Sequence, residues 1–223
     1  MFTTASVIGR GRAGSAIAAR LQERGVTVGD DRTGLVMLCV PDAAIRTVAQ
    51  TIAPGPWIAH VSGATPLSAL DPHTKRFGVH PLQTFTRARG PEQLDGAFAA
   101  VTAESEEARE LAVDLARLLG LEPFVLDESQ RALYHAGAAI SSNFLVTLYR
   151  AAAELLESAG APPEALVPLM RRTIENGFAL TGPIERGDWE TVEAHLAAIR
   201  EAHPELEPVY RALVDLTAEK VAP

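Results

Sequence analysis

The sequence has 223 residues, 47% of them apolar and 22% charged, and a net charge of −8, which fits a globular protein of one or two domains with a sizeable core. The negative charge disfavours nucleic acid as a partner, and the single cysteine, Cys39, argues against a disulfide framework or a metal site. We expect a cytoplasmic protein without membrane contact, because no apolar run approaches the roughly 20 residues that span a bilayer and the N-terminus has no signal segment.

Strands and helices alternate along residues 1–127. Short apolar runs of the kind found in buried strands include TTASVIG, LVMLCV, WIAHVS, RFGVH, AFAAVTA and EPFVLD. Helical patterns lie between them, at residues 13–24, after Pro41-Asp42, and at 105–119. This order predicts a doubly wound, mostly parallel α/β sheet.

From residue 128 onward the pattern is helical only. We expect one long helix over 128–158 with Asp127 or Ser129 as its N-cap, and further helices over 163–180, 189–202 and 205–220. Asp188 is the expected N-cap of the helix over 189–202. The sequence therefore predicts an all-helical domain over 128–223.

A glycine motif, VIGRGRAG, follows the first strand directly and opens the first helix. Its G-x-G-x-x-G spacing is that of a Rossmann-type dinucleotide-binding turn, in which the helix N-terminus faces the pyrophosphate. The alternative is a strand–helix turn that is only rich in glycine. The residues predicted to contact a cofactor here are Gly9, Arg10, Gly11, Arg12, Ala13 and Gly14.

The next part of such a site is abbreviated. An acidic residue about 20 positions after the motif usually binds the ribose, and Asp30 and Asp31 lie there; the adjacent Arg32 is suited to a 2′-phosphate. Only DDRTG separates the second strand from the third, which leaves no room for a crossover helix. A ribose role for these residues and a solvated turn therefore both stay open.

Ligands of open α/β sheets bind beyond the carboxyl ends of the strands. Val40 and Pro41 end the third strand and are expected to line the cofactor site. Ser62 ends the fourth strand, and Gln83 follows the fifth; both are candidates for substrate binding.

Three histidines of the first half need separate interpretations. His80, at the end of the fifth strand, is a candidate acid or base, because imidazole exchanges protons near neutral pH. The alternative is a structural histidine that precedes Pro81. His60 lies inside a strand and is expected to be structural, whereas His73 is expected to be exposed in a polar turn.

The helix ALYHAGAAISSNFLVTLY carries an unusual set of polar residues. His135 is a second catalytic candidate, Asn143 a third, and Ser142 a candidate for substrate binding. The alternative is that these groups bond to one another or lie in a dimer interface. Arg186, in the connector TGPIERGD, could bind an acidic substrate.

The glycine motif together with CVPD, HVSGA, GVHPLQTF, YHAGAAISSNF and LTGPIERGD resembles a family of short bacterial proteins with a Rossmann-like domain and a C-terminal domain of unknown function, labelled NADP oxidoreductases. The layout is similar to the 6-phosphogluconate dehydrogenase superfamily, in which a helical domain generally builds a dimer. The hydroxyacid dehydrogenases of that superfamily have a Lys four residues before an Asn. Here Asn143 matches the Asn, but Ala139 stands at the Lys position, so a lysine-based mechanism does not carry over.

These observations lead to an expected function. The leading hypothesis is an NAD(P)-dependent oxidoreductase that transfers hydride to or from a small, carboxylate-bearing metabolite, with NADP favoured over NAD by resemblance alone and a homodimer formed through the helical domain. The alternative is a non-catalytic nucleotide-binding sensor or dimeric interaction protein that retains the dehydrogenase fold. Fold by itself does not decide between them, because function depends on the site.

Overall fold

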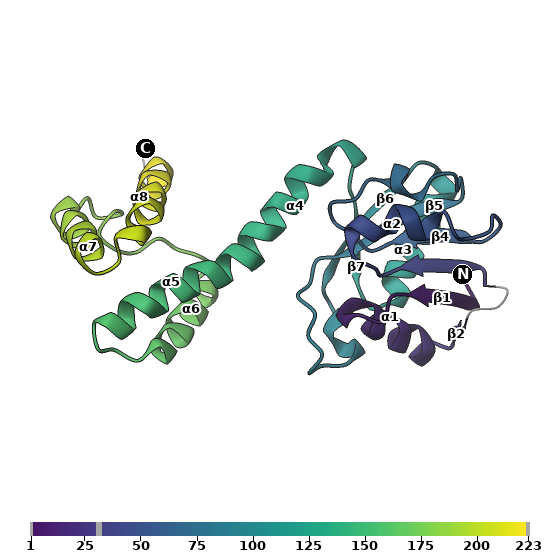
Figure 1. The fold of residues 1–223 in the computed structure, drawn as a ribbon, viewed down its shortest axis with the longest axis horizontal. Coiled ribbons are helices and arrows are strands. Elements are labelled where there is room, and N and C mark those ends of the chain that lie inside the picture. Colours follow the sequence, from purple (N-terminus) through teal and green to yellow (C-terminus); the bar gives the residue numbers. More distant parts are fainter. Residues whose placement is uncertain (1, 30–32, 222–223) are drawn as a thin grey trace. The chain divides into compact units, whose positions relative to one another are not determined.

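The computed structural model describes residues 2–29 and 33–221, so Asp30, Asp31 and Arg32, with their predicted ribose role, lie outside the described residues. The chain forms two compact units, Met1–Ile140 and Ser141–Pro223. The first contains the sheet and the second is helical (Figure 1).

A seven-stranded sheet in the order β2-β1-β3-β4-β5-β6-β7 forms the centre of the first unit. Neighbouring strands are parallel except β5 and β6, which are antiparallel. The predicted doubly wound, mostly parallel sheet is therefore confirmed. The strands are β1 (Thr4–Ile8), β2 (Thr27–Val28), β3 (Leu35–Leu38), β4 (Trp57–His60), β5 (Arg76–Pro81), β6 (Phe98–Ala103) and β7 (Glu122–Val125).

The sheet has a core on each face, because successive side chains of a strand point to opposite faces. In β3, Leu35 and Met37 join one core while Val36 and Leu38 join the other. Helices α1 (Arg12–Glu23) and α3 (Glu106–Leu118) contribute to the first core, and α2 (Asp42–Ala49) with the 3-10 helix η1 (Leu67–Leu70) contributes to the second. This burial on both faces explains why the strands are apolar throughout.

The second face changes character beyond β3. The register places His60, Gly78 and Thr102 side by side on β4, β5 and β6. These residues are covered by polar side chains from the 3-10 helix η3 (Glu128–Gln130) and from α4 (Arg131–Ala139). One part of the sheet is thus covered through hydrogen bonds instead of apolar packing.

Strand β2 is as short as the sequence predicts. Among the described residues, β2 pairs with Thr4 and Ala5 of β1, which itself continues to Ile8. The described part of β2 thus lies beside the beginning of β1.

The predicted helix over 128–158 begins in the first unit and continues in the second, and a π turn, η4 (Ile140–Phe144), divides it between α4 and α5 (Leu145–Ser158). Asp127 is confirmed as an N-cap by its bond from the Ser129 backbone N–H. The small core of the second unit comprises Val192, Leu196 and Val214. The remaining helices are η5 (Pro163–Ala165), α6 (Leu166–Glu175), α7 (Trp189–Ala202), η6 (Pro204–Leu206) and α8 (Glu207–Val221).

Two boundaries differ from expectation. The predicted helix over 163–180 ends at Glu175, and the chain turns at Gly177 and Phe178, both with positive φ. The strands end at Val125, close to the domain boundary expected after residue 127, but the compact units divide at Ile140. Among the described residues, no helix is long and apolar enough to cross a membrane.

The two-core arrangement makes a prediction about stability. Phe77 is fully buried in the first core, whereas 52% of Phe98 is exposed. We expect Phe77→Ala to lower the free energy of unfolding by about 3–5 kcal/mol and the control Phe98→Ala by less than about 1 kcal/mol. Urea denaturation followed by circular dichroism measures both, and equal losses would contradict this assignment of the core.

Candidate functional site

The three glycines of the motif have different surroundings. Gly9 has φ +106°, and a Cβ there would lie 2.3 Å from the carbonyl oxygen of Cys39. A Cβ on Gly14 would lie 2.0 Å from the carbonyl oxygen of Gly9. Gly11 has an ordinary φ of −71°, and a Cβ there would meet nothing within 4 Å. Close packing explains two of the glycines, whereas the third borders open space.

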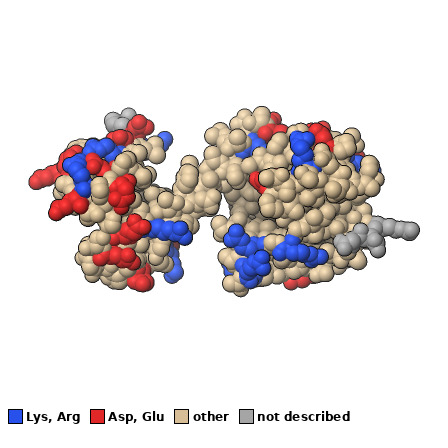
Figure 2. Space-filling model, in the orientation of Figure 1, with Lys and Arg blue, Asp and Glu red and all other residues tan. Residues whose placement is uncertain are grey.

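Among the described residues, no side chain caps the first backbone N–H groups of α1, next to the open space at Gly11. Gly11 is the N-cap and provides no side-chain cap, and the first turn holds no acidic residue. The first backbone N–H groups of a helix lack partners within it and carry a partial positive charge. Arg10 and Arg12 are exposed next to this turn, followed by the half-buried Ala13. Figure 2 shows Lys and Arg side chains gathered over the region of α1, so the surroundings suit an anion.

The end of β3 lies against the glycine turn. The Cys39 backbone N–H donates to the carbonyl oxygen of Ile8 at 2.8 Å, and burial raises the pKa of the Cys39 thiol to about 12. Val40 is half-buried and Pro41 is exposed directly after it. A neutral thiol and two apolar residues thus follow the strand, in the place where the sequence predicts the wall of a cofactor site.

His80 contacts two aromatic side chains of α4. Its Nδ1 lies 2.7 Å from the hydroxyl oxygen of Tyr134, and the two rings meet edge to face. The ring centroids of His80 and His135 are 6.0 Å apart at an interplanar angle of 72°. The structure thus brings together two of the predicted catalytic residues and adds a tyrosine.

This surrounding keeps His80 neutral. Burial, followed by the nearby charges of His135 and Arg131, lowers the pKa of His80 to about 4, while Asp42 opposes this shift. Burial also raises the pKa of the Tyr134 hydroxyl to about 12. At neutral pH the pair therefore consists of an uncharged imidazole and an uncharged phenol.

Gly63 lies against both histidines. A Cβ at this position would lie 2.6 Å from Cδ2 of His135 and 2.9 Å from Nε2 of His80. The glycine is required because a side chain would occupy the space beside the histidine pair. This requirement concerns contacts between distant segments, so the sequence pattern alone gave no sign of it.

The position of Tyr134 depends on a small residue in the sheet. The register places Ala100 between His80 on β5 and Phe124 on β7. The Tyr134 ring contacts both neighbours, with 5.9 Å between its centroid and that of Phe124. A larger residue at Ala100 would compete with Tyr134 for this surface.

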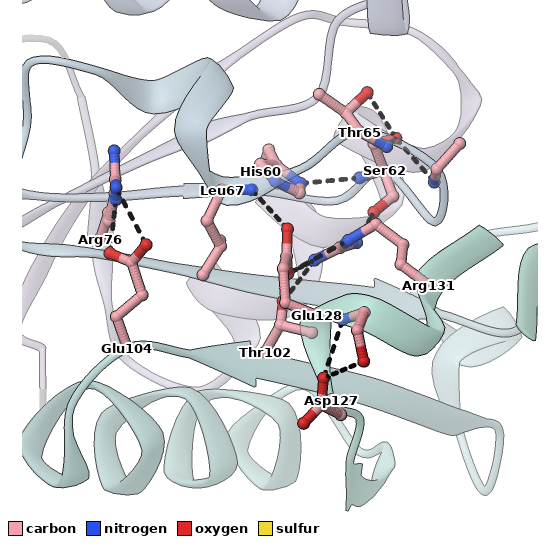
Figure 3. Close-up of polar contacts among 12 residues, drawn as sticks. His60, Ser62, Thr65, Leu67, Arg76, Thr102, Glu104, Asp127, Glu128 and Arg131 are labelled. Atoms are coloured by element: carbon pink, nitrogen blue, oxygen red, sulfur yellow. Dashed lines mark hydrogen bonds and ion pairs between the residues drawn. The ribbon is translucent and has the colours of Figure 1, made fainter.

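A buried arginine joins α4 to the sheet (Figure 3). Arg131 is 4% exposed, and its guanidinium donates to the carbonyl oxygen of Ser62 at 3.0 Å and to the hydroxyl of Thr102 at 2.5 Å. It also pairs with Glu128 at 2.9 Å, whose other oxygen accepts the backbone N–H of Leu67 at 2.8 Å. These bonds hold both ends of the loop that contains Gly63.

His60 lies fully buried near Arg131, as the predicted structural role requires. Its Nδ1 accepts the backbone N–H of Ser62 at 3.3 Å, while its Nε2 has no partner among the described residues. Burial, followed by the charges of Arg131 and His80, lowers the pKa of His60 to about 3. The prediction that His73 is exposed is wrong: its ring is buried and bonds to the carbonyl oxygen of Ala49 at 2.9 Å.

The two predicted substrate-binding residues of this unit bond within their own loops. The Ser62 hydroxyl accepts the backbone N–H groups of Ala64 and Thr65 and donates to the Thr65 hydroxyl. These three bonds use the one donor and two acceptor positions of a hydroxyl. Gln83 donates to the carbonyl oxygen of Gln93 at 2.9 Å and accepts the backbone N–H of Thr84.

The remaining predicted site residues belong to the second unit. Ser142 and Asn143 lie in the π turn, where Ser142 is half-buried and Asn143 is exposed. Arg186 is exposed in the connector that precedes α7. Single-turn π segments occur frequently at functional sites, so this local irregularity coincides with the polar residues that the sequence singles out.

A doubly wound sheet with a dinucleotide-type glycine turn, followed by a helical unit, defines a Rossmann-like class of protein. The chain belongs to the family described as "Domain of unknown function (DUF2520)", whose model matches residues 97–217. The matched range begins at β6, so the glycine turn precedes it.

Solved structures of similar fold cover nearly the whole chain. The "putative NADP oxidoreductase BF3122" of Bacteroides fragilis is 22% identical with a TM-score of 0.82, covering 97% of this chain and 98% of its own. Protein TM1727 of Thermotoga maritima is 21% identical with a TM-score of 0.80, covering 96% and 98%. The 1-pyrroline-5-carboxylate reductase of Streptococcus pyogenes is 16% identical with a TM-score of 0.63, covering 98% and 97%. No curated protein matches the sequence. At these identities the likeness establishes the fold.

The lowered pKa values of His60 and His80 make stability depend on pH. An unfolded histidine binds a proton near pH 6.5, whereas the folded pKa values are about 3 and about 4. Between these values the unfolded state binds more protons, so stability is fully present above pH 6.5 and is lost as the pH falls. From pH 7 to pH 5 we expect a loss of roughly 2 kcal/mol for each histidine.

Urea denaturation at the two pH values measures this effect. The variant His60→Asn keeps an acceptor for the Ser62 N–H, and we expect it to remove about half of the pH dependence. The control His195→Asn alters an exposed histidine of α7 and should leave the dependence unchanged. A wild-type protein that is equally stable at pH 7 and pH 5 would contradict the prediction.

Proposed function

We propose that this protein is an NAD(P)-dependent oxidoreductase that transfers hydride to or from a small, carboxylate-bearing molecule. The proposal rests on the fold, on the glycine turn and on the two histidines at the carboxyl edge of the sheet. NADP is favoured over NAD only by the resemblance of the sequence motifs.

The open space at Gly11 is the observation that carries the proposal. Gly9 and Gly14 would be required in any tightly packed strand–helix turn, because a Cβ on either would collide with backbone. Gly11 has no such reason within the described chain, and its conformation is open to other residues. A glycine there is explained if a pyrophosphate must approach the backbone.

The chain offers suitable groups for each part of the cofactor. The backbone N–H groups at the start of α1, including that of Ala13, would bind the pyrophosphate, with Arg10 and Arg12 adding positive charge. Val40 and Pro41 would line the route toward the sheet edge. When bound, the nicotinamide supplies or accepts the hydride.

His80 is the residue that we assign to proton transfer. It lies at the carboxyl edge of the sheet, and its ring is half-buried with Nε2 beside Gly63. His135 is adjacent and half-buried. Ser142, Asn143 and Arg186 are proposed as substrate-binding residues on the chemistry of their side chains, Arg186 for a carboxylate, and Ser62 and Gln83 would shape the loops near His80.

We propose a homodimer formed through the helical unit. The support is a set of large apolar side chains that are at least 40% exposed on the helices of that unit: Leu145, Val146, Leu148, Val167, Leu169, Val209, Leu213 and Leu216. An exposed apolar surface of this extent is typical of an interaction site.

A second candidate function is nucleotide binding without turnover, as a sensor or interaction module. The short β2, whose described residues pair with Thr4 and Ala5, favours it, because a short second strand reduces the part of the site that ordinarily binds the ribose. Oxidation or reduction of the cofactor in the presence of any substrate would support the oxidoreductase and exclude a protein that binds the nucleotide without turnover.

Calorimetric titration with NADPH and with NADH tests the binding site. We expect micromolar binding of at least one cofactor, and a loss of at least about 100-fold in affinity for Gly11→Asp, because the carboxylate enters the open space and repels phosphate. Aspartate is a favourable N-cap residue, so this variant should stay folded. The control Gln50→Asp adds the same charge at the C-cap of α2 instead of at the start of α1, and this variant should bind the cofactor as the wild type does. Absence of binding to either cofactor would refute the proposal.

Light scattering after size exclusion tests the dimer. We expect twice the mass of one chain for the wild type and a shift toward the monomer mass for the double variant Leu169→Glu, Leu216→Glu. Leu133→Glu, which changes an equally apolar and 74% exposed residue of α4, is the control and should leave the mass unchanged. A monomeric wild type would refute this part of the proposal.

A further inference from the structure

The hydrogen bond between Tyr134 and His80 restricts where the imidazole carries its proton. A neutral histidine has one donor and one acceptor nitrogen, and the bond made by one nitrogen decides the state of the other. Imidazole nitrogen is a much stronger acceptor than a phenol oxygen, and a phenol is a stronger donor than a neutral imidazole. The 2.7 Å contact therefore favours donation by the Tyr134 O–H to Nδ1 of His80.

The other ring nitrogen of His80, Nε2, faces the backbone of Gly63, where the absence of a side chain leaves space. Nε2 of His80 lies where a Cβ of Gly63 would come within 2.9 Å, and the loop that carries Gly63 is held by Arg131 through the carbonyl oxygen of Ser62. The Tyr134 ring packs edge to face against Phe124 as well as against His80. Nδ1 of His80 thus faces Tyr134, which packs against Phe124, and Nε2 faces the Gly63 loop, which Arg131 holds.

We propose that Tyr134 is a positioning residue that holds His80 as the tautomer with its proton on Nε2, and that this neutral N–H is the donor to a carbonyl oxygen of the substrate. The inference deepens the proposed function and depends on it for the identity of the reaction. The tautomer of His80 does not depend on substrate or cofactor, so it can be measured on the protein by itself.

The proton transfer balances without a charged imidazole. In the direction of reduction, hydride addition forms a C–H bond, and the electron pair of the C=O bond moves to oxygen. That oxygen takes the proton from Nε2 while Nδ1 takes the proton of the Tyr134 hydroxyl. A proton from solvent then returns to Nε2 while Nδ1 gives its proton back to the Tyr134 oxygen, which restores the starting tautomer. A neutral donor suits this site, because burial, His135 and Arg131 disfavour the imidazolium.

This arrangement favours one class of substrate. A carbonyl oxygen that gains negative charge accepts a hydrogen bond from Nε2–H, and so does the hydroxyl oxygen of the reduced product. A protonated imine carries its own N–H and requires an acceptor, which the Nε2–H tautomer does not offer. We therefore assign the ketone or aldehyde and alcohol pair, and not the imine and amine pair, to this site.

Nitrogen-15 NMR of the histidine rings tests the inference on the full chain without cofactor. Long-range proton–nitrogen correlations distinguish protonated from unprotonated ring nitrogens, and His80→Gln assigns the signals. We expect His80 to carry its proton on Nε2 at pH 7.5 in the wild type. Tyr134→Phe keeps the ring but removes the hydroxyl, and should move the His80 nitrogen signals toward a mixture of tautomers.

The chain provides a matched control. Tyr210 bonds to Nδ1 of His195 at 2.8 Å in the second unit, so Tyr210→Phe removes an equivalent bond and should change the His195 signals while leaving those of His80 unchanged. A wild-type His80 with its proton on Nδ1, or His80 signals that Tyr134→Phe does not alter, would overturn the inference.

Kinetics separate this inference from the proposed function. Once turnover is found, we expect Tyr134→Phe to lower kcat by about 10- to 100-fold with little change in KM, at the lower end of what general acid–base catalysis contributes. Turnover of cyclic imines but not of carbonyl compounds would refute the assigned substrate class. Failure of cofactor binding would refute the proposed function while leaving the tautomer result intact.

Discussion

The buried guanidinium of Arg131 is the interaction on which the candidate site depends. It replaces an apolar contact between α4 and the sheet by directed bonds to Ser62, Thr102 and Glu128. Because these bonds have fixed geometry, they set the position of the first turns of α4. Tyr134 and His135 follow within one turn and therefore meet His80. Loss of the arginine would leave buried polar groups without partners, which is costly.

The residues around this arginine are matched to it. Gly78 leaves room for the guanidinium, since a Cβ there would lie 3.3 Å from Arg131 and 2.5 Å from the Thr102 hydroxyl. His60 stays neutral beside the charge because burial prevents its protonation. A polar region within the sheet unit thus consists of groups whose sizes and charges are compatible only when all are present.

The glycine turn and the histidine pair differ in what they require of the chain. The turn depends on residues that are adjacent in sequence and on contacts with Cys39 at the end of β3. The histidine pair depends on β5, on the loop after β4 and on α4, which are far apart in sequence. The abbreviated β2 pairs with β1, which leads into the turn, whereas His80 lies on β5, and β3 and β4 separate β1 from β5 in the sheet.

Short-range pattern determined the strands, the two-sided core, α1, α7 and the caps at Asp127 and Asp188, because hydrophobic period and capping chemistry are local properties. The same pattern identified the glycine turn and singled out His80 and His135. Only the tertiary structure decided that Tyr134 bonds to His80, that Gly63 lies against both histidines, that Arg131 is buried, and that His73 is not exposed. Each of these depends on side chains from different elements meeting in space. Such meetings are set by strand register and helix placement, which hydrophobic period does not encode.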